Sequence, residues 1–181
     1  MDFEATCEKN VELKSREIIE FPSILYCLED GKITLIDVFQ KYVKPTINPK
    51  LSDFCTKLTG ITQSQVDNAE TLPIIYKKHF AWLEPKIRGN TCYFITCGNW
   101  DLDIQLPAEC KMKNIKMNHI YKKFLNIKDM FYSTYKIKGT GLLDMLEKLS
   151  LSFTGRQHSG FDDCVNTSTL LTKLINDGYK F

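Results

Sequence analysis

The sequence predicts a single α/β domain. Two stretches rich in Ile, Phe, Tyr and Val, residues 15–28 and 32–43, flank the turn sequence Glu-Asp-Gly at 29–31 and are typical of a β-hairpin. Apolar residues at helical spacing follow Pro73 and recur over residues 142–149. A chain of 181 residues that is 43% hydrophobic can bury a sizeable core, so one domain over the whole chain is the simplest organisation.

The first half of the chain supplies strands and then helices. Residues 2–6 are expected to form a first strand that joins the hairpin. Thr62, with Gln65 three residues later, forms a capping box that begins a short helix. The helix after Pro73 is longer, and we expect its histidine to pack on the apolar face. That face contains Leu72, Ile75, Tyr76, His79, Phe80 and Leu83.

The second half continues the α/β pattern. Residues 92–96 form a short apolar run that predicts a buried central strand. The leucines of 142–149 mark an amphipathic helix. Ser159 and Asp162 suit a capping box for the last helix, which is expected to end at Gly178.

Composition excludes several classes of protein. The seven cysteines are scattered without a Cys-x-x-Cys pair, so disulfide scaffolds and zinc ribbons are excluded and reduced thiols are expected. No apolar run approaches membrane-spanning length. A Gly-x-Ser-x-Gly motif is missing, which removes the main support for a serine hydrolase. We expect a cytoplasmic monomer, or alternatively a nuclear one, that does not engage membranes.

Residues 111–138 form a lysine-rich stretch, although the net charge of the chain is only +2. The stretch contains one acid, Asp129, and eight lysines: Lys111, Lys113, Lys116, Lys122, Lys123, Lys128, Lys136 and Lys138. Its aromatic residues are Tyr121, Phe124, Phe131, Tyr132 and Tyr135. Such a stretch could follow a phosphate backbone and stack on bases. Equally, it could be a solvated outer face whose aromatic residues point into the core.

Four acidic residues and one histidine form a pattern suited to phosphodiester hydrolysis. They are Asp2, Glu4, Asp101, His158 and Asp163. In an extended segment Asp2 and Glu4 point to the same face, because they are two residues apart. Hydrolysis needs an activated water, charge neutralisation and help for the leaving oxygen. Two divalent ions about 3.5–4 Å apart supply all three, and carboxylates hold such ions.

The other members of the pattern suit the same chemistry. Asp163 is expected in the first turn of the last helix. Asp101 closely follows the strand at 92–96, although Asp103 is an alternative ligand. The imidazole of His158 can take a proton from the attacking water. Each signal is common alone, so their joint occurrence in order carries the prediction.

Five segments resemble the Eri1-like branch of the DEDDh exonucleases, which includes the enzyme that trims histone mRNA ends and small interfering RNAs. The segments are residues 2–7, 54–62, 99–101, 145–149 and 155–163. The run Leu-Thr-Gly-Ile-Thr within the second segment marks this branch. The resemblance implies a ribonuclease H-like mixed sheet flanked by helices. It also implies two Mg²⁺ or Mn²⁺ ions and release of nucleoside 5'-monophosphates from the 3' hydroxyl end of RNA, with DNA as an alternative substrate.

The resemblance also implies a role for each motif residue. Asp2, Glu4 and Asp163 would bind one metal ion, Asp2 would also reach the second, and Asp101 would act mostly through water. His158 would be the general base.

Seven further residues would contact the substrate. Arg156 would touch a phosphate, and the remaining six would surround the 3' nucleotide. These six are Ala5, Thr6, Phe54, Leu58, Thr59 and Trp100. Phe54 and Leu58 could instead simply belong to the core.

One departure from the family pattern concerns the first strand. Family members enter Asp-Phe-Glu through several apolar residues, whereas Met1 stands directly before Asp2 here. We therefore expect a truncated first strand; either the true start lies upstream or metal binding is weakened. The family's nucleic-acid-binding SAP module is also missing from this sequence. Two functions remain: an active exonuclease, favoured by the complete ligand set, and a catalytically weak nucleic-acid-binding or scaffolding module.

Overall fold

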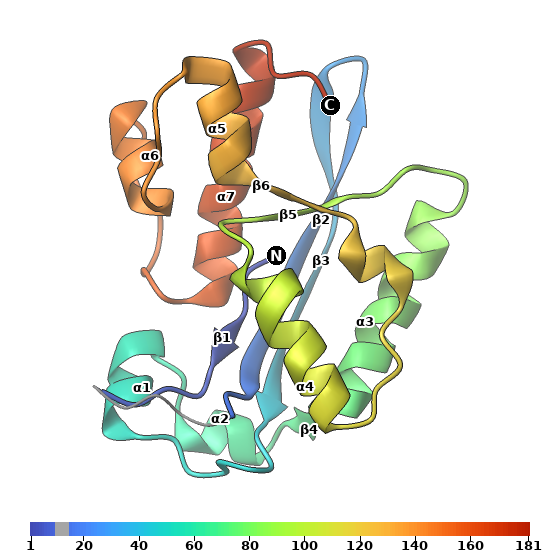
Figure 1. Ribbon diagram of the computed structural model, residues 1–181, viewed down its shortest axis with the longest axis vertical. Coiled ribbons are helices and arrows are strands. Elements are labelled where there is room, and N and C mark those ends of the chain that lie inside the picture. Colours follow the sequence, from blue (N-terminus) through green and yellow to red (C-terminus); the bar gives the residue numbers. More distant parts are fainter. Residues whose placement is uncertain (10–14) are drawn as a thin grey trace.

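A long β-hairpin forms the middle layer of the molecule (Figure 1). The computed structural model describes residues 1–9 and 15–181. The hairpin consists of β2 (Ile18–Glu29) and β3 (Lys32–Lys44), which pair antiparallel with a register shift between Leu25 and Tyr26. Asp30 and Gly31 at its turn have φ of 49° and 75°, as tight hairpin turns require. The predicted hairpin is therefore confirmed, although its first strand begins at Ile18.

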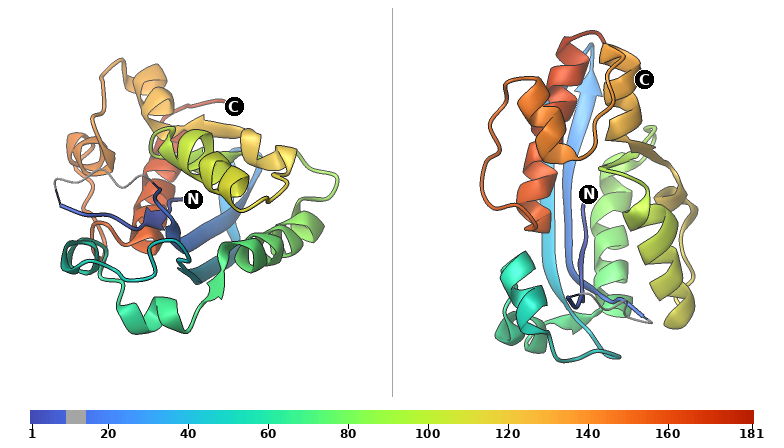
Figure 2. Two further views of the ribbon diagram at one scale, coloured as in Figure 1. Left: turned by 60° about the horizontal axis from the view of Figure 1, so that its bottom comes forward. Right: turned by 60° about the vertical axis from the view of Figure 1, so that its left-hand side comes forward.

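Helices cover both faces of the hairpin (Figure 2). On one face α7 packs on β2, and α5 and α6 pack on α7. On the other face lie α3 and α4, so the domain is a three-layer α/β/α arrangement, and the predicted α/β class is confirmed. The helices are α1 (Asp53–Thr59), α2 (Gln63–Asp67), α3 (Leu72–Ile87), α4 (Leu106–Met112), α5 (Ile127–Tyr135), α6 (Leu142–Lys148) and α7 (Gly160–Asn176), with a π-helix η1 (Trp100–Gln105) and a 3-10 helix η2 (His119–Lys122).

The short strands differ from the prediction. The first strand is only two residues long, β1 (Glu4–Ala5), and pairs antiparallel with β2. The second short strand, β4 (Glu70–Thr71), pairs parallel with the end of β3. The run at 92–96 yields β5 (Phe94–Thr96), whose strand partner is β6 (Phe124–Asn126) in a separate parallel pair. The predicted strand is therefore confirmed, but its central position is wrong, because among the described residues β5 pairs only with β6 and lies outside the hairpin sheet.

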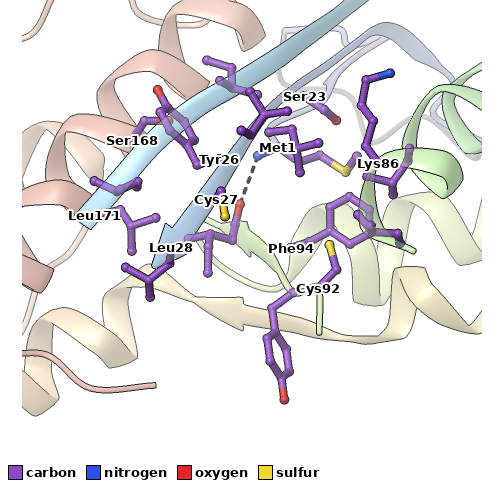
Figure 3. Close-up of a pocket in the computed structure, with 18 of the residues that line it drawn as sticks. Met1, Ser23, Tyr26, Cys27, Leu28, Lys86, Cys92, Phe94, Ser168 and Leu171 are labelled. Carbon is purple, nitrogen blue, oxygen red and sulfur yellow. Dashed lines mark hydrogen bonds between the residues drawn. The ribbon is translucent and has the colours of Figure 1, made fainter. Parts of the chain in front are cut away.

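An apolar groove of about 690 Å³ lies between β2 and β5 (Figure 3). Its walls include residues 23–28 of β2 and residues 92–95, and Met1 lies in it with its amine donating to the carbonyl of Ile95 at 3.0 Å. Among the side chains that line it, only that of Lys86 is charged. The groove therefore supplies no Asp or Glu side chain for phosphodiester chemistry.

Helix α3 anchors the opposite layer. Pro73 lies in its first turn, where a missing backbone N–H costs nothing. His79 is fully buried, and its two ring nitrogens bond the hydroxyls of Tyr121 at 2.7 Å and Ser23 at 2.9 Å. Burial lowers the pKa of His79 to about 3, so the ring is neutral and joins three elements. The prediction that His79 packs in the helix interface is confirmed.

Several aromatic residues of the lysine-rich stretch belong to the core, which the nucleic-acid interpretation did not expect. Tyr121 and Phe131 are completely buried, and the Tyr135 hydroxyl donates to Asp177 at 2.6 Å. Tyr132 remains half exposed. The core interpretation therefore holds for Tyr121 and Phe131, which cannot stack on bases.

Lys113 is held in the structure by two ion pairs. Its amine forms ion pairs with Glu17 at 2.9 Å and Glu109 at 2.8 Å, while its side chain is only 10% exposed. Both carboxylates are fully buried. Glu17 additionally accepts the backbone N–H groups of residues 46–48. The amine of Lys113 thus neutralises buried charge and does not face a phosphate path.

We expect Lys113→Gln to destabilise the fold by about 3–5 kcal/mol, because it leaves two buried carboxylates without their cation. Urea unfolding would measure this. The exposed neighbour Lys116, changed to Gln, serves as the control and should shift the free energy of unfolding by no more than about 0.5 kcal/mol. Equal midpoints for the two variants would contradict the structural role.

Candidate active site

Three carboxylates from opposite ends of the chain meet at one place. Asp2, Glu4 and Asp163 each offer an oxygen atom within 4.8 Å of the others. Asp2 and Glu4 flank Phe3, whose buried ring packs on Phe21 with centroids 4.5 Å apart. Burial of Phe3 on one side of this extended segment therefore turns both carboxylates to the other side. Asp163 lies in the first turn of α7.

Asp101 joins the cluster from the π-helix η1. It is only 4% exposed, and its Oδ1 accepts the backbone N–H of Phe3 at 2.7 Å. This bond ties η1 to the segment that carries Asp2 and Glu4. Asp103, in contrast, is exposed, so the structure favours Asp101 over its alternative.

The start of α7 is shaped by close packing. Ser159 is the N-cap residue, and its hydroxyl accepts the N–H of Asp162 at 3.4 Å. Gly160 follows, and a Cβ there would lie 2.6 Å from the carbonyl oxygen of Asp2. The Asp162 carboxylate accepts the N–H of Arg156 and does not return to the cap. The predicted capping box is therefore one-sided, but Asp163 is free to face the cluster.

Glu20 is a fifth carboxylate at this site that the sequence prediction missed. It is 2% exposed and lies opposite Glu4 in the β1–β2 pairing. Its Oε2 accepts the N–H of Gly160 at 3.0 Å, and its Oε1 accepts the side-chain amide of Gln40 at 2.7 Å. Glu20 thus joins β2 to the start of α7. The available signal was a charged residue inside the apolar run of 18–21, a position that demands a buried partner.

The clustered carboxylates raise one another's pKa. Burial raises the pKa of Glu4 to about 9, and the charges of Asp163 and Glu20 add to the effect. Burial likewise raises the pKa of Asp163 to about 6. The pKa of Asp2 is raised by burial and by the charge of Asp101. Carboxylate oxygens are the ligands that hard divalent cations prefer, so this donor set fits Mg²⁺ or Mn²⁺.

We expect Glu4→Gln to raise the melting temperature of the chelator-treated protein at pH 8 by a few degrees. The folded state holds the Glu4 proton more tightly than the unfolded chain does. Its stabilisation is therefore present below the ordinary carboxyl pKa of 4.5 and is lost as pH rises toward about 9. Gln carries no ionisable proton, so the variant does not lose stability in this way as pH rises. Each kcal/mol of unfolding free energy corresponds to about 2–4 °C in melting temperature for a chain of this size. Thermal denaturation from pH 5 to 8 would measure the change.

The exposed Glu8, changed to Gln, is the matched control. It should leave the pH dependence of the melting temperature unchanged. A Glu4→Gln protein that melts below the wild type at pH 8 would show that repulsion within the cluster does not limit stability.

A cavity of about 250 Å³ adjoins the carboxylates. It is lined by Phe3, Glu4, Ala5, Thr6, Cys7, Arg16, Leu58 and Trp100. Four of the six residues predicted to surround the nucleotide therefore line it. Arg16 is an additional lining residue that the sequence prediction missed, because nothing in its local sequence distinguishes it from other exposed cations.

Phe54 and Thr59 do not line this cavity. Thr59 is 3% exposed, and its hydroxyl donates to the carbonyl of Cys55 at 2.9 Å and accepts the N–H of Ile61 at 3.1 Å. Its hydroxyl is thus bonded within the corner that follows α1, and the contact of Thr59 with a nucleotide stays a prediction. Phe54 is half-buried on α1, and the structure gives it no place in the cavity wall.

His158 lies at the rim of the cluster and is exposed. Its backbone φ of 61° lies in the left-handed region, which few non-glycine residues adopt, and its backbone N–H donates to Asp163 Oδ2 at 3.1 Å. Arg156 lies two residues earlier, and its guanidinium donates to the carbonyl of Lys57. His158 therefore lies beside the carboxylates. The described hydrogen bond of the Arg156 guanidinium goes instead to α1.

The family model described as Exonuclease (RNase_T) matches residues 1–171. The chain belongs to the exonuclease family. It is 41% identical over 183 residues to the human "3'-5' exoribonuclease 1", covering 98% of this chain and 52% of the relative. It is 36% identical over 188 residues to the human "ERI1 exoribonuclease 3", covering 100% of this chain and 54% of the relative. This exonuclease chain thus spans about half the length of the curated relatives it matches.

Solved structures show the same relationship. The nuclease domain of 3'hExo, described as a DEDDh family member bound to rAMP, superposes with a TM-score of 0.91 at 41% identity, covering 98% of this chain and 90% of that one. A structure described as recognition of the histone mRNA stem-loop by 3'-exonuclease superposes at 0.90 with 39% identity, covering 98% of this chain and 63% of that one. The predicted relationship to DEDDh exonucleases is confirmed. In the described ranges 1–9 and 15–181, no helix is long and apolar enough to cross a membrane.

Proposed function

We propose that this exonuclease removes nucleotides one at a time from the 3' hydroxyl end of RNA and releases nucleoside 5'-monophosphates, with DNA as an alternative substrate. The observation that carries the proposal is the position of three carboxylates, within 4.8 Å of one another, beside a 250 Å³ cavity. The names of the relatives, "3'-5' exoribonuclease 1" and "ERI1 exoribonuclease 3", support the choice of RNA.

Each part of the site has a separate task in this proposal. Asp2, Glu4 and Asp163 would hold the metal ion, with Asp2 and Asp101 on the side of a second one. Two such ions, when bound, supply charge neutralisation and an activated nucleophile at neutral pH.

The chain's other groups position the substrate and move protons. Leu58 and Trp100 lie on the walls of the cavity and would hold the terminal base between them. His158, at the exposed rim, would take the proton of the attacking water. Solvent beyond His158 can then accept that proton.

The test uses single-stranded RNA with a free 3' hydroxyl and a label in its last phosphodiester bond. With Mg²⁺ or Mn²⁺, the labelled mononucleotide should be the first product, and chelator should abolish it. The same RNA ending in a 3' phosphate is the matched control and should be degraded much more slowly. A DNA strand of the same sequence measures the sugar preference, and a hairpin with a short 3' tail measures tolerance of structured ends.

Two outcomes would contradict the proposal. Release of labelled oligonucleotides would indicate internal cleavage. Tight RNA binding without product in either metal would instead favour the alternative, a catalytically weak nucleic-acid-binding or scaffolding module.

We propose further that the protein acts as a monomer in the cytoplasm, with the nucleus as the alternative. All seven cysteines are free thiols in the structure, which is consistent with a reducing compartment. Fractionation of cells with an antibody to the protein, and light scattering of the pure protein, would test these two points.

A further inference from the structure

Arg156 belongs to the loop that carries His158, but its side chain is bonded to a different element. Its Nη2 donates to the backbone carbonyl of Lys57, in the last turn of α1. Its Nη1 lies over Gly60, the left-handed C-cap of α1 with φ of 76°, where a Cβ would overlap it. The guanidinium thus joins two segments that are 99 residues apart in the sequence.

The backbone of Arg156 is fixed to the start of α7. Its N–H donates to Asp162 Oδ2 at 2.9 Å, and its carbonyl accepts the N–H of Ser159 at 3.3 Å. Gly155 precedes it with φ of 84°, and a Cβ there would lie 2.5 Å from the Asp162 carboxylate carbon. The loop therefore follows one tight path between α7 and α1.

Burial does little to hold this loop. Residues 154–158 are all exposed, so hydrogen bonds rather than apolar packing determine their position. His158, inside this stretch, has the left-handed φ of 61° and must be held there by its surroundings. The other described side-chain hydrogen bonds of this stretch go to α7, whereas the bond from Arg156 goes to α1.

Helix α1 is also part of the substrate site. Leu58, which follows Lys57 directly, lines the 250 Å³ cavity beside the carboxylates. The guanidinium lies close enough to the cluster for its charge to lower the pKa of Glu4 against the stronger effect of burial. Arg156 is therefore placed between the wall of the nucleotide cavity and the loop of the general base.

We propose that Arg156 is a positioning residue that holds the His158 loop against α1, so that the residue acts on the reaction through His158. This inference rests on the proposed exonuclease function. It replaces the sequence-based expectation that Arg156 contacts a phosphate. A planar guanidinium is suited to the task, because it can bond a carbonyl and lie flat on Gly60 at the same time.

Substitution separates the two roles. Arg156→Lys keeps the charge but loses the planar fork, whereas Arg156→Gln loses both. We expect turnover on RNA to fall about 10–100-fold in both variants, as is typical for residues that orient a reacting group. KM and the salt dependence of RNA binding should stay near the wild type. Arg88→Gln, an exposed change at the end of α3, is the matched control and should leave turnover unchanged.

A direct phosphate contact would give a different result. Lys would then preserve most of the activity, and Gln would flatten the salt dependence of single-strand binding by about 0.7 in log-log slope. Either finding would overturn the proposal.

A double-mutant cycle tests whether Arg156 acts through His158. In a His158→Ala background, adding Arg156→Gln should lower turnover by less than about twofold, because a positioning residue has nothing left to position. A full additional 10–100-fold loss would overturn the proposal.

Hydrogen exchange keeps the inference testable even if wild-type RNA hydrolysis, and with it the proposed function, fails. Amide exchange over residues 154–159 and at the end of α1 should accelerate in Arg156→Gln and stay unchanged in Arg88→Gln. Unchanged exchange in Arg156→Gln would overturn the proposal on its own.

Discussion

Asp163→Asn and Asp2→Asn should each lower turnover on RNA by about 10³-fold or more while the protein remains folded. Metal ions contribute several kcal/mol of charge stabilisation in the transition state, and each 1.36 kcal/mol is a factor of ten in rate. Both residues belong to the trio within 4.8 Å, so replacing either with an amide removes one anionic donor from a set of three. Single-turnover hydrolysis with saturating enzyme would measure the loss.

Asp103→Asn is the matched control for this pair. Asp103 lies on the same π-helix as Asp101 but is exposed, so its substitution should leave turnover within about twofold. A thermal shift on adding Mn²⁺ provides a second measurement, because a ligand present at about 100 times its Kd stabilises the folded state by about 2.7 kcal/mol. That shift should largely disappear in Asp2→Asn and Asp163→Asn. Full activity of both variants would contradict the assignment of Asp2 and Asp163 as metal ligands.

The part of this site that could be predicted is the part that local sequence encodes. The alternation around Phe3 fixes the side on which Asp2 and Glu4 lie. The α7 position of Asp163 follows from the cap at Ser159. Both features depend on backbone geometry within a few residues, so contacts with distant segments do not change them.

The remaining features depend on contacts between distant segments. Glu20 acquires its role only because the start of α7 lies against β2, and Lys113 acquires its role only because Glu17, 96 residues away, is buried beside it. Charge pattern alone cannot distinguish a lysine that faces phosphate from one that neutralises a buried pair.

The short strands were hard to predict for a related reason. Strands β5 and β6 are three residues each, and they are joined by lateral pairing between segments about thirty residues apart. Runs this short lack the length over which a hydrophobic period can be recognised. Thr59 shows the same limit at one residue, because its hydroxyl is used by the turn that follows α1. A motif position predicts where such a residue lies, but not which neighbour takes its hydrogen bonds.

His158→Ala should lower turnover by about 10²–10⁴-fold, the usual loss on removing a general base, with little change in KM for RNA. His158 is exposed at the rim of the carboxylate cluster, so its ring is not needed to fill the core. A base acts only when it is deprotonated. The rise of turnover with pH that comes from His158 should therefore be lost in the variant.

The exposure of His158 permits a sharper experiment. Removing its side chain leaves a gap open to solvent, so imidazole added to the buffer should restore part of the activity in proportion to its neutral form. His119→Ala is the matched control, because His119 is also exposed but lies on η2 among lysines; it should neither lose activity nor respond to imidazole. If His158→Ala keeps its turnover and pH profile, the proton is taken elsewhere and the strained backbone at His158 serves only to present its N–H to Asp163.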